Sequence, residues 1–449
     1  MLYEARNLRR SFTIGLAFAL TLAALDGSML TARAGRASDY PMLGHDLTRG
    51  SVSPDTTVSA SHWPALTLQH TVALGGFILA SPAVAYNRNL GVNVIYAATS
   101  GAPSFAAINA GSGAIIWQVP LAADAYSSPA VFNNTVYFGS EDHHVYALNA
   151  TTGKLVCSFD TGGRVEASPA VANIDGTGPL VFVGDTGVTE SNNAGHQWAI
   201  NGVGNTNPKC TVRWSFNAWA NTNNGHNTGT WSSAALGNDA TGRPLLVFGS
   251  TQPDDSVYAL DARDGSQAWR FQTVIGKDTD VGAAPTISPP GQNGLADGAV
   301  YVQGKDRHEW ALDLFTGALL WDFDMTTLKC STNPVSGTAL VGSLVVFNFC
   351  KWIYILDAAP TGPGTTSVVW RSPPGAHARA SPTISGPPGD QVILRGDKEG
   401  NEDAYSLLGH TVLTPFFVGS TTTEIIASTA VSAGLVVFAG TDGNVYVLG

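Results

Sequence analysis

The sequence predicts an all-β chain folded as an eight-bladed β-propeller of four-stranded antiparallel blades. An N-terminal strand is expected to complete the C-terminal blade and close the ring. Three observations predict this fold. The chain of 449 residues contains 50 Gly and 24 Pro, and only 13% of its residues are charged. One strand pattern recurs at spacings of roughly 40–64 residues. The last repeat ends before its fourth strand, whereas a strand-like segment precedes the first repeat.

The composition excludes several classes of protein. A low charged fraction argues against long solvated helices, coiled coils and intrinsic disorder. The formal net charge of −11 disfavours nucleic acid and anionic membranes as partners. The many turn residues instead favour short strands joined by tight turns.

The N-terminus has the features of a secretory signal. Basic residues up to Arg10 precede an apolar run of 14 residues, 12–25, and Ala32-Arg33-Ala34 offers a cleavage site. We therefore expect a signal peptide over 1–34, a lead segment over 35–62 and the propeller over 63–449. The mature protein would be periplasmic or secreted, with no transmembrane segment; the alternative is an uncleaved anchor.

Four cysteines in an exported chain are the number required for two disulfides. Three pairings are formally possible, and the residues alone do not choose among them. The sequence-neighbour pairing joins Cys157 to Cys210 and Cys330 to Cys350.

Each predicted blade opens with a strand of small residues, typified by Ser-Pro-Ala-Val. The eight opening strands are expected at 81–84, 128–131, 168–171, 232–235, 284–287, 334–337, 381–384 and 428–431. An apolar strand ending in Gly follows, then a strand such as Val257-Tyr-Ala-Leu-Asp261, and then Thr-Gly-x-x-x-Trp. We expect these Trp residues to pack between blades, and Cys157 occupies the Trp position of the second blade.

Ring closure is expected at the two ends of this pattern. The last repeat stops at Leu448, and residues 63–72 resemble the outer strand that begins at Trp269. Pairing the N-terminal strand with the last blade would remove the open seam.

The Ala-Leu-Asp-x-x-Thr-Gly-x-x-x-Trp repeat resembles the PQQ-binding-like β-propeller superfamily, which includes the quinoprotein alcohol dehydrogenases. The resemblance covers roughly residues 40–449.

In an up-and-down blade, the links between blades share one face of the ring with the hairpins between second and third strands. We name this the candidate face, because the unusual polar and charged residues fall mostly on its loops; the alternative is that charges lie wherever loops are solvated.

The resemblance implies a quinone cofactor over the ring axis, stacked on a Trp. The Gly-rich segment entering the fourth blade places Trp231 in that position, and Lys305 matches the basic residue beside the quinone oxygens. Arg379 and Arg395 would complement cofactor carboxylates. The alternatives are an aromatic packed at the ring centre and, for the basic residues, solvated ion pairs.

The resemblance also implies a calcium ion and a catalytic base. Glu190 and Gln252 match the metal-binding positions, although the family has Asn where Gln252 stands. The acidic link after the fourth blade supplies Asp278 and Asp280, one of which would accept the proton of an alcohol, and Asp280 would also contact the metal. The alternatives are a solvated Glu190 and a structural Asx turn at the two aspartates.

Two departures from the quinoprotein dehydrogenases leave two functions open. The chain has no adjacent Cys-Cys pair, and it lacks the long insertions that cap the cofactor in that family. The first function is a PQQ- and calcium-dependent oxidoreductase acting on a small alcohol or polyol. The alternative is a non-catalytic propeller that binds a protein partner or a glycan in the cell envelope.

Overall fold

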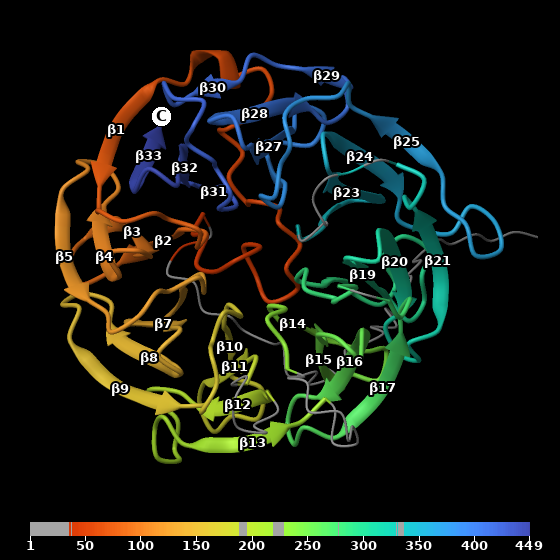
Figure 1. Ribbon diagram of the computed structural model, residues 1–449, viewed down its shortest axis with the longest axis horizontal. Coiled ribbons are helices and arrows are strands. Elements are labelled where there is room, and N and C mark those ends of the chain that lie inside the picture. The colour runs from red at the N-terminus through yellow and green to blue at the C-terminus, as the bar shows by residue number, and fades with distance from the viewer. Residues whose placement is uncertain are drawn as a thin grey trace, which may run out of the picture.

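The computed structural model describes residue 36 and residues 38–187, 195–218, 229–276, 278–328, 330 and 336–449. Eight antiparallel sheets follow one another around a ring, each with four strands from the axis outwards and one with an additional short strand (Figure 1). The strands follow the sequence order in every blade except the last, whose outer strand comes from the N-terminal part of the chain. The predicted propeller is therefore confirmed. The predicted signal peptide, 1–34, lies outside the described residues.

The first four blades contain strands β2 to β17. Blade one has β2 (Ala83–Asn87), β3 (Val92–Thr99), β4 (Ser104–Asn109) and β5 (Ile115–Pro120); blade two has β6 (Ala130–Phe132), β7 (Thr135–Gly139), β8 (His144–Asn149) and β9 (Leu155–Asp160). Blade three has β10 (Ala170–Ala172), β11 (Leu180–Gly184), β12 (Gln197–Asn201) and β13 (Val212–Phe216); blade four has β14 (Ala235–Asn238), β15 (Pro244–Gly249), β16 (Ser256–Asp261) and β17 (Gln267–Gln272).

The other four blades contain β18 to β33 and β1. Blade five has β18 (Thr286–Ser288), β19 (Ala299–Gln303), β20 (His308–Asp313) and β21 (Leu319–Asp324); blade six has β22 (Ala339–Val341), β23 (Leu344–Phe349), β24 (Trp352–Asp357) and β25 (Val368–Arg371). Blade seven has β26 (Thr383–Ser385), β27 (Val392–Gly396), β28 (Asn401–Ser406), β29 (Thr411–Val412) and the extra β30 (Phe416–Phe417). Blade eight has β31 (Ala430–Ser432), β32 (Leu435–Ala439), β33 (Asn444–Leu448) and β1 (Leu68–Ala73).

Ring closure occurs as predicted, because β1 pairs antiparallel with β33. The closing strand is shorter than expected: a 3-10 turn occupies Trp63–Ala65, and the strand begins at Leu68. One opening strand was also misplaced. Blade six begins at Ala339 rather than within 334–337, because its inner strand follows Gly337-Thr338 and lacks the Ser-Pro signal.

The lead segment lies along the ring axis, which the sequence did not predict (Figure 1). It bonds to all eight blades at or just before their inner strands. Its backbone bonds join Tyr40 to Val84, Pro41 to Val131, Leu47 to Leu236, Thr48 to Ile287, Gly50 to Leu340, and Ser51 and Ser53 to Ile384. The fully buried Arg49 donates to the carbonyls of Ser168, Pro169 and Ala234 in blades three and four, and Ser53 Oγ donates to Val431 O in blade eight. These bonds satisfy backbone groups at the centre that would otherwise lack partners.

Serine hydroxyls link the starts of neighbouring blades around the axis. In six of these links, a backbone N–H of one blade donates to a serine of the next: Ser81 to Ser128, Ser128 to Ser168, Ser168 to Ser233, Gly337 to Ser381, Ser381 to Ser428, and Ser428 to Ser81. The opening Ser of the Ser-Pro-Ala-Val pattern therefore joins neighbouring blades.

The outer strands interlock through Trp and Gly. Trp117 lies against Gly153 of the next blade, where an added Cβ would come within 2.8 Å of the indole, and Trp214 and Trp269 lie in the same way against Gly265 and Gly317. Each indole N–H donates to a carbonyl near that turn; for Trp269 the distance is 2.9 Å. The interblade packing expected of these Trp residues is confirmed.

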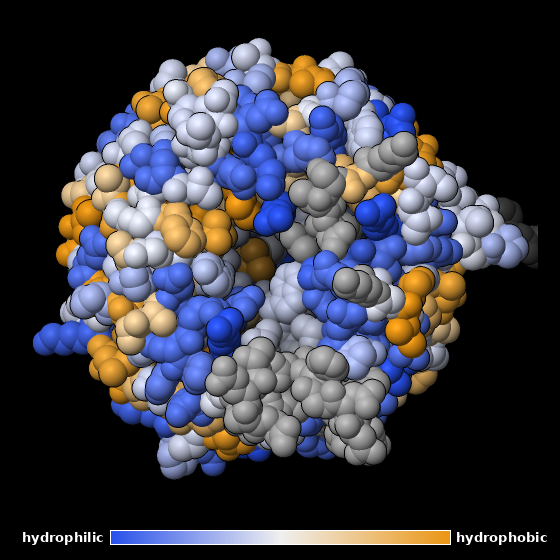
Figure 2. Space-filling model, in the orientation of Figure 1, coloured by the Kyte–Doolittle hydropathy of each residue, from blue (hydrophilic) through white to orange (hydrophobic). Residues whose placement is uncertain are grey.

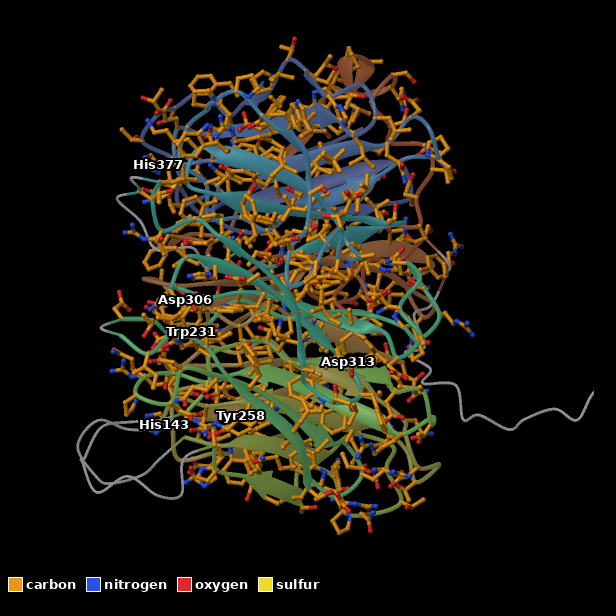
Figure 3. The ribbon with its side chains drawn as sticks, turned by 90° about the vertical axis from the view of Figure 1, so that its right-hand side faces the viewer. His143, Trp231, Tyr258, Asp306, Asp313 and His377 are labelled. Carbon is orange, nitrogen blue, oxygen red and sulfur yellow. A yellow bond between two sulfur atoms is a disulfide. The ribbon has the colours of Figure 1, made fainter. Side chains whose placement is uncertain are left out.

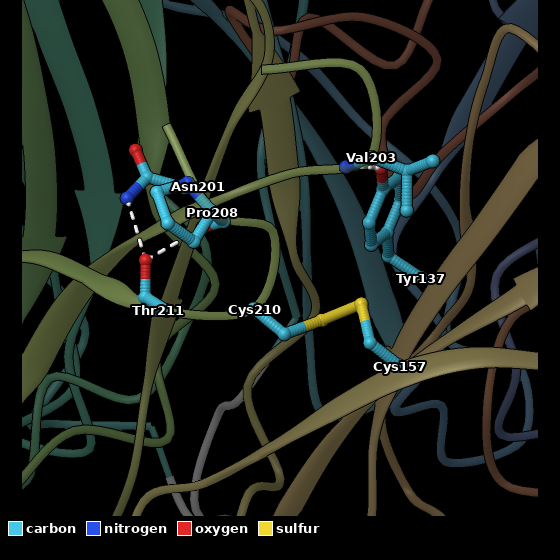
Figure 4. Close-up of a disulfide and its surroundings, with 7 residues drawn as sticks. All are labelled: Tyr137, Cys157, Asn201, Val203, Pro208, Cys210 and Thr211. Carbon is cyan, nitrogen blue, oxygen red and sulfur yellow. Dashed lines mark hydrogen bonds between the residues drawn. A yellow bond between two sulfur atoms is a disulfide. The ribbon is translucent and has the colours of Figure 1, made fainter. Parts of the chain in front are cut away.

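A disulfide replaces one of these interlocks (Figure 4). Cys157 has the strand register of the Trp residues, opposite Ala147 as Trp117 is opposite Ala107. Its partner, Cys210, has the positive φ of the turn glycines, 55°. Both sequence-neighbour pairings, Cys157–Cys210 and Cys330–Cys350, are present.

We predict that the double substitution C157W/C210G restores the common interlock. The variant should fold without this disulfide, and reductant should destabilise it less than the wild type. The control C157S/C210S should lose about 2–4 kcal/mol, the typical contribution of a disulfide. Denaturant unfolding with and without reductant measures the difference. Equal destabilisation of both double variants would show that the two contacts are not equivalent.

Two buried glutamates bridge blades elsewhere in the ring. Glu309 accepts a hydrogen bond from Thr338 Oγ1 at 2.7 Å, and Glu402 accepts one from Thr429 Oγ1 at 2.6 Å. Burial raises the pKa of each glutamate to about 8. The protonated carboxyl is therefore favoured in the folded protein, whereas the unfolded chain titrates near the ordinary pKa of 4.5.

We predict that the contribution of these glutamates to stability is fully present below about pH 4.5 and is lost as the pH rises through about 8. The variant E309Q/E402Q should lack this part of the pH dependence and gain on the order of a few kcal/mol over the wild type at the alkaline end. Thermal unfolding of both proteins across this range is the measurement. Parallel pH curves would contradict the prediction.

Candidate functional site

The candidate site lies on the candidate face, where blades four and five meet near the axis. Figure 3 places Trp231, Asp306, His143 and His377 on this side of the ring and Asp313, in a turn between outer strands, on the other side. Figure 2 shows the candidate face hollowed at its centre, with hydrophilic residues on much of the rim.

Lys305 lies at the centre of a cluster of predicted site residues. Its Nζ lies 2.8 Å from Asp278 Oδ1, 2.7 Å from Asp280 Oδ2 and 5.2 Å from the centroid of the Trp231 ring. Lys305 comes from the β19–β20 hairpin, the two aspartates from the link between β17 and β18, and Trp231 from the segment entering β14. Three separate segments therefore supply one ion cluster beside an indole.

The pKa of Lys305 shows that its charge is retained. Burial lowers this pKa, but the hydrogen bonds and charges of Asp278 and Asp280 outweigh burial and raise it above the ordinary value. Lys305 therefore remains an ammonium, and the group of one cation and two carboxylates carries a net negative charge at neutral pH.

Trp231 is half-buried against the backbone of the same link. A Cβ added to Gly282 would lie 1.9 Å from the indole atoms Cη2 and Cζ2, so only Gly fits beneath this ring. The glycine at this position therefore fixes where the indole lies.

The hairpin between β15 and β16 holds the acidic link in place. The backbone N–H of Gln252 donates to Asp280 Oδ1 at 2.8 Å, and its side-chain Nε2 donates to Gly276 O at 2.6 Å. Thr279 Oγ1 donates to Asp255 Oδ2 at 2.9 Å. Both carboxylate oxygens of Asp280 are thus engaged, one by Gln252 and one by Lys305.

Asp255 is a member of the site that sequence reasoning did not single out. Its side chain is buried, and its Oδ1 has no hydrogen-bond partner among the described residues. Burial, together with repulsion from Asp280, Asp254 and Asp306, raises its pKa to about 6, although the Thr279 hydrogen bond opposes the shift. Two adjacent aspartates, Asp254 and Asp255, in the hairpin between β15 and β16 were the sequence feature that could have indicated this residue.

A second group of charges on this face was also missed. Arg164 Nε lies 3.4 Å from Glu141 Oε2, and burial and repulsion from Glu166 raise the pKa of Glu141 to about 7. Burial raises the pKa of Glu166, and the positive charge of Lys305 opposes part of this rise.

Of the remaining predicted site residues, Arg379 and Arg395 lie outside this cluster. Arg379 is exposed in the link between blades six and seven. Arg395 is fully buried within β27, where its Nη2 donates to Asp403 Oδ2 at 2.5 Å. Glu190 lies outside the described residues, and within them no group of three or more His, Cys, Asp or Glu side chains is arranged to hold a metal ion.

Comparison with known proteins gives a family match over most of the chain. The PQQ_2 family, described as "Outer membrane protein assembly factor BamB", matches residues 88–202 and 207–372. The chain is 24% identical over 328 residues to the tetrathionate hydrolase of Acidithiobacillus ferrooxidans, covering 59% of this chain and 63% of the relative. It is 27% identical over 220 residues to the glycerol dehydrogenase large subunit of Gluconobacter oxydans, covering 40% of this chain and 29% of the relative. The chain thus spans less than two thirds of either relative.

Solved structures share the fold. The quinohemoprotein alcohol dehydrogenase of Comamonas testosteroni has a TM-score of 0.71 and 15% identity, covering 93% of this chain and 81% of its own. A europium-containing methanol dehydrogenase has a TM-score of 0.70 and 13% identity, covering 92% and 98%. BamB from Moraxella catarrhalis has a TM-score of 0.56 and 14% identity, covering 85% and 99%. With the family match, these observations show that the chain belongs to the PQQ_2 family of BamB-like β-propellers.

Proposed function

We propose that the candidate face binds a quinone cofactor of the PQQ class and that the protein oxidises a small alcohol or polyol there. The observation that carries this proposal is the convergence of Trp231, Lys305, Asp278 and Asp280 from three loops onto one point of the face. The similarity to the dehydrogenases supports it.

We place the protein outside the cytoplasm, periplasmic or secreted, because it contains two disulfides and the sequence predicts a signal peptide. Within the described residues, no helix has the length and apolar character of a membrane span.

Among the described residues, Trp231 and Lys305 fit a planar quinone, whereas no set of ligands for a metal ion is present. Trp231 would stack on the ring system, and Lys305 would donate to a quinone oxygen. The calcium ion that the sequence resemblance implies has no matching set of ligands among the described residues. Asp280 already accepts from Lys305 and Gln252, so we assign no step to a metal.

The reaction that we propose uses the carboxylates of the acidic link. A bound quinone would supply the acceptor for the hydride of an alcohol. Asp280 would accept the hydroxyl proton, since its Oδ2 lies 2.7 Å from Lys305 Nζ, which itself lies over the Trp231 ring. Lys305 would hold the carboxylate in place, and the Gln252 N–H would hold its second oxygen.

The second candidate function is a binding scaffold in the cell envelope, with a protein or glycan as its partner. The match to the BamB family and the lack of a metal-binding group among the described residues favour this alternative. In that case, Lys305 and its two aspartates would serve only to hold the loops of blades four and five together.

We predict that Asp280→Asn lowers alcohol oxidation by about 10²–10⁴-fold while the protein still binds PQQ, because Asn cannot accept the proton. Asp278→Asn is the matched control and should keep most of the activity. Dye-linked oxidation after loading with PQQ is the measurement. Full activity of the Asp280→Asn variant would contradict the assignment of the base.

We predict that Lys305→Met weakens PQQ binding about tenfold or more, since a hydrogen bond from a charged donor contributes about 1.5–3 kcal/mol. Lys305→Arg, which keeps the charge, should retain most of the affinity. Titration followed by quinone absorbance measures both variants. If the wild type itself shows no saturable binding, the oxidoreductase proposal fails and the scaffold function is favoured.

A further inference from the structure

One cross-strand pair in blade seven is charged, whereas the equivalent pair in each of the other seven blades is apolar. In blades two, four, six and eight, a Phe near the end of the second strand and its cross-strand Tyr form a stacked aromatic pair. The pairs are Phe138–Tyr146, Phe248–Tyr258, Phe347–Tyr354 and Phe438–Tyr446, with ring centroids 5.4, 5.7, 5.6 and 5.4 Å apart. At an equivalent register, blade seven has Arg395 opposite Asp403.

The Arg395 side chain points towards blade six. Ile393, two residues earlier and therefore on the same side of the strand, packs against Val346 and Ile355 of that blade. A Cβ added to Gly375, in the link between the two blades, would lie 3.3 Å from Arg395 Nη2. A guanidinium thus lies in the seam between blades six and seven, beneath the Gly375 loop.

The hydrogen bonds of Arg395 are incomplete. Its Nη2 donates to Asp403 and to Tyr405 OH, whereas Nε and Nη1 have no partner among the described residues. The residue is 0% exposed. A buried ion pair rarely exceeds an aromatic pair in stability, and unpaired charged donors add a further cost. Stability therefore does not explain why this blade has a charge at that position.

Further polar groups surround the outer end of the seam. His377 Nδ1 is buried without a hydrogen-bond partner among the described residues. Burial is the main cause that lowers the pKa of His377, and the positive charges of Lys351 and Lys398 lower it further. The negative charges near the seam are Asp403, which is paired with Arg395, Asp397, whose charge acts on Asp403, Glu399, which opposes the shift of His377, and Glu424, 3.5 Å from Lys398 Nζ.

We propose that the seam between blades six and seven is a binding site for a small oxyanion, with Arg395 as its buried anchor. The anion would enter beside Gly375, accept hydrogen bonds from the free donors of Arg395, and be attracted by Lys351 and Lys398 at the surface. The ligand class is a carboxylate or a sulfate-like oxyanion. This site is separate from the Trp231–Lys305 cluster and does not depend on the proposed oxidation.

The test compares the wild type with R395F/D403Y, which installs the aromatic pair found in blades two, four, six and eight and should therefore fold. Calorimetric titrations with sulfate and, separately, with acetate are made at constant ionic strength. We expect saturable 1:1 binding to the wild type and at least tenfold weaker binding to the double variant. Preference for sulfate points to a free inorganic anion, and preference for acetate points to an organic carboxylate; either supports the site.

A surface variant, K351M/K398M, provides an independent test should R395F/D403Y not fold. It leaves the core intact and should bind the preferred anion several-fold more weakly, with an unchanged unfolding temperature in the absence of the anion. The proposal is overturned if the wild type binds neither anion saturably. It is also overturned if the wild type and a folded R395F/D403Y variant bind with the same affinity.

Discussion

The lead segment on the ring axis is the constraint on which the rest of the structure depends. Eight inner strands present unpaired backbone edges to the axis, and the stretch from Tyr40 to Ser53 bonds to every blade at or just before its inner strand. Arg49 fills the centre and binds carbonyls of two blades. The candidate face, on which the unusual loops gather, is hollowed at its centre (Figure 2).

Against this repeated frame, departures from the pattern separate into two kinds. The Cys157–Cys210 disulfide keeps the geometry of the Trp and Gly interlock, with Cys210 in the backbone conformation of the glycine that it replaces. Arg395 keeps the strand register but replaces an apolar residue with a buried charge, whose Nε and Nη1 have no partner among the described residues. The first kind preserves packing, whereas packing and stability do not explain the second, to which we assign the proposed anion site.

The repeat made the fold predictable, because each blade carries its own strand and turn signals. Blade number, ring closure at β1 and the role of the Trp residues followed from it. The axial path of the lead segment did not, since its residues pair one by one with distant strands and show no periodicity. In the site, Trp231 and Lys305 were found through the order of family motifs. Arg395 was expected at the site because a run of charges follows it, and only the structure shows that its side chain points into the seam. The raised pKa of Asp255 likewise depends on burial.

Function on this face depends on what Lys305 contacts besides Asp278 and Asp280. In an oxidoreductase, the ammonium lies between the carboxylates and a ligand stacked on Trp231. In a scaffold, the same ion cluster would serve only to hold the loops. A crystal structure of the protein with PQQ distinguishes the two most directly. Our account predicts the quinone stacked on Trp231, with one of its oxygens within hydrogen-bond distance of Lys305 Nζ. PQQ bound away from this indole, or absent from crystals grown at saturating concentration, would contradict it.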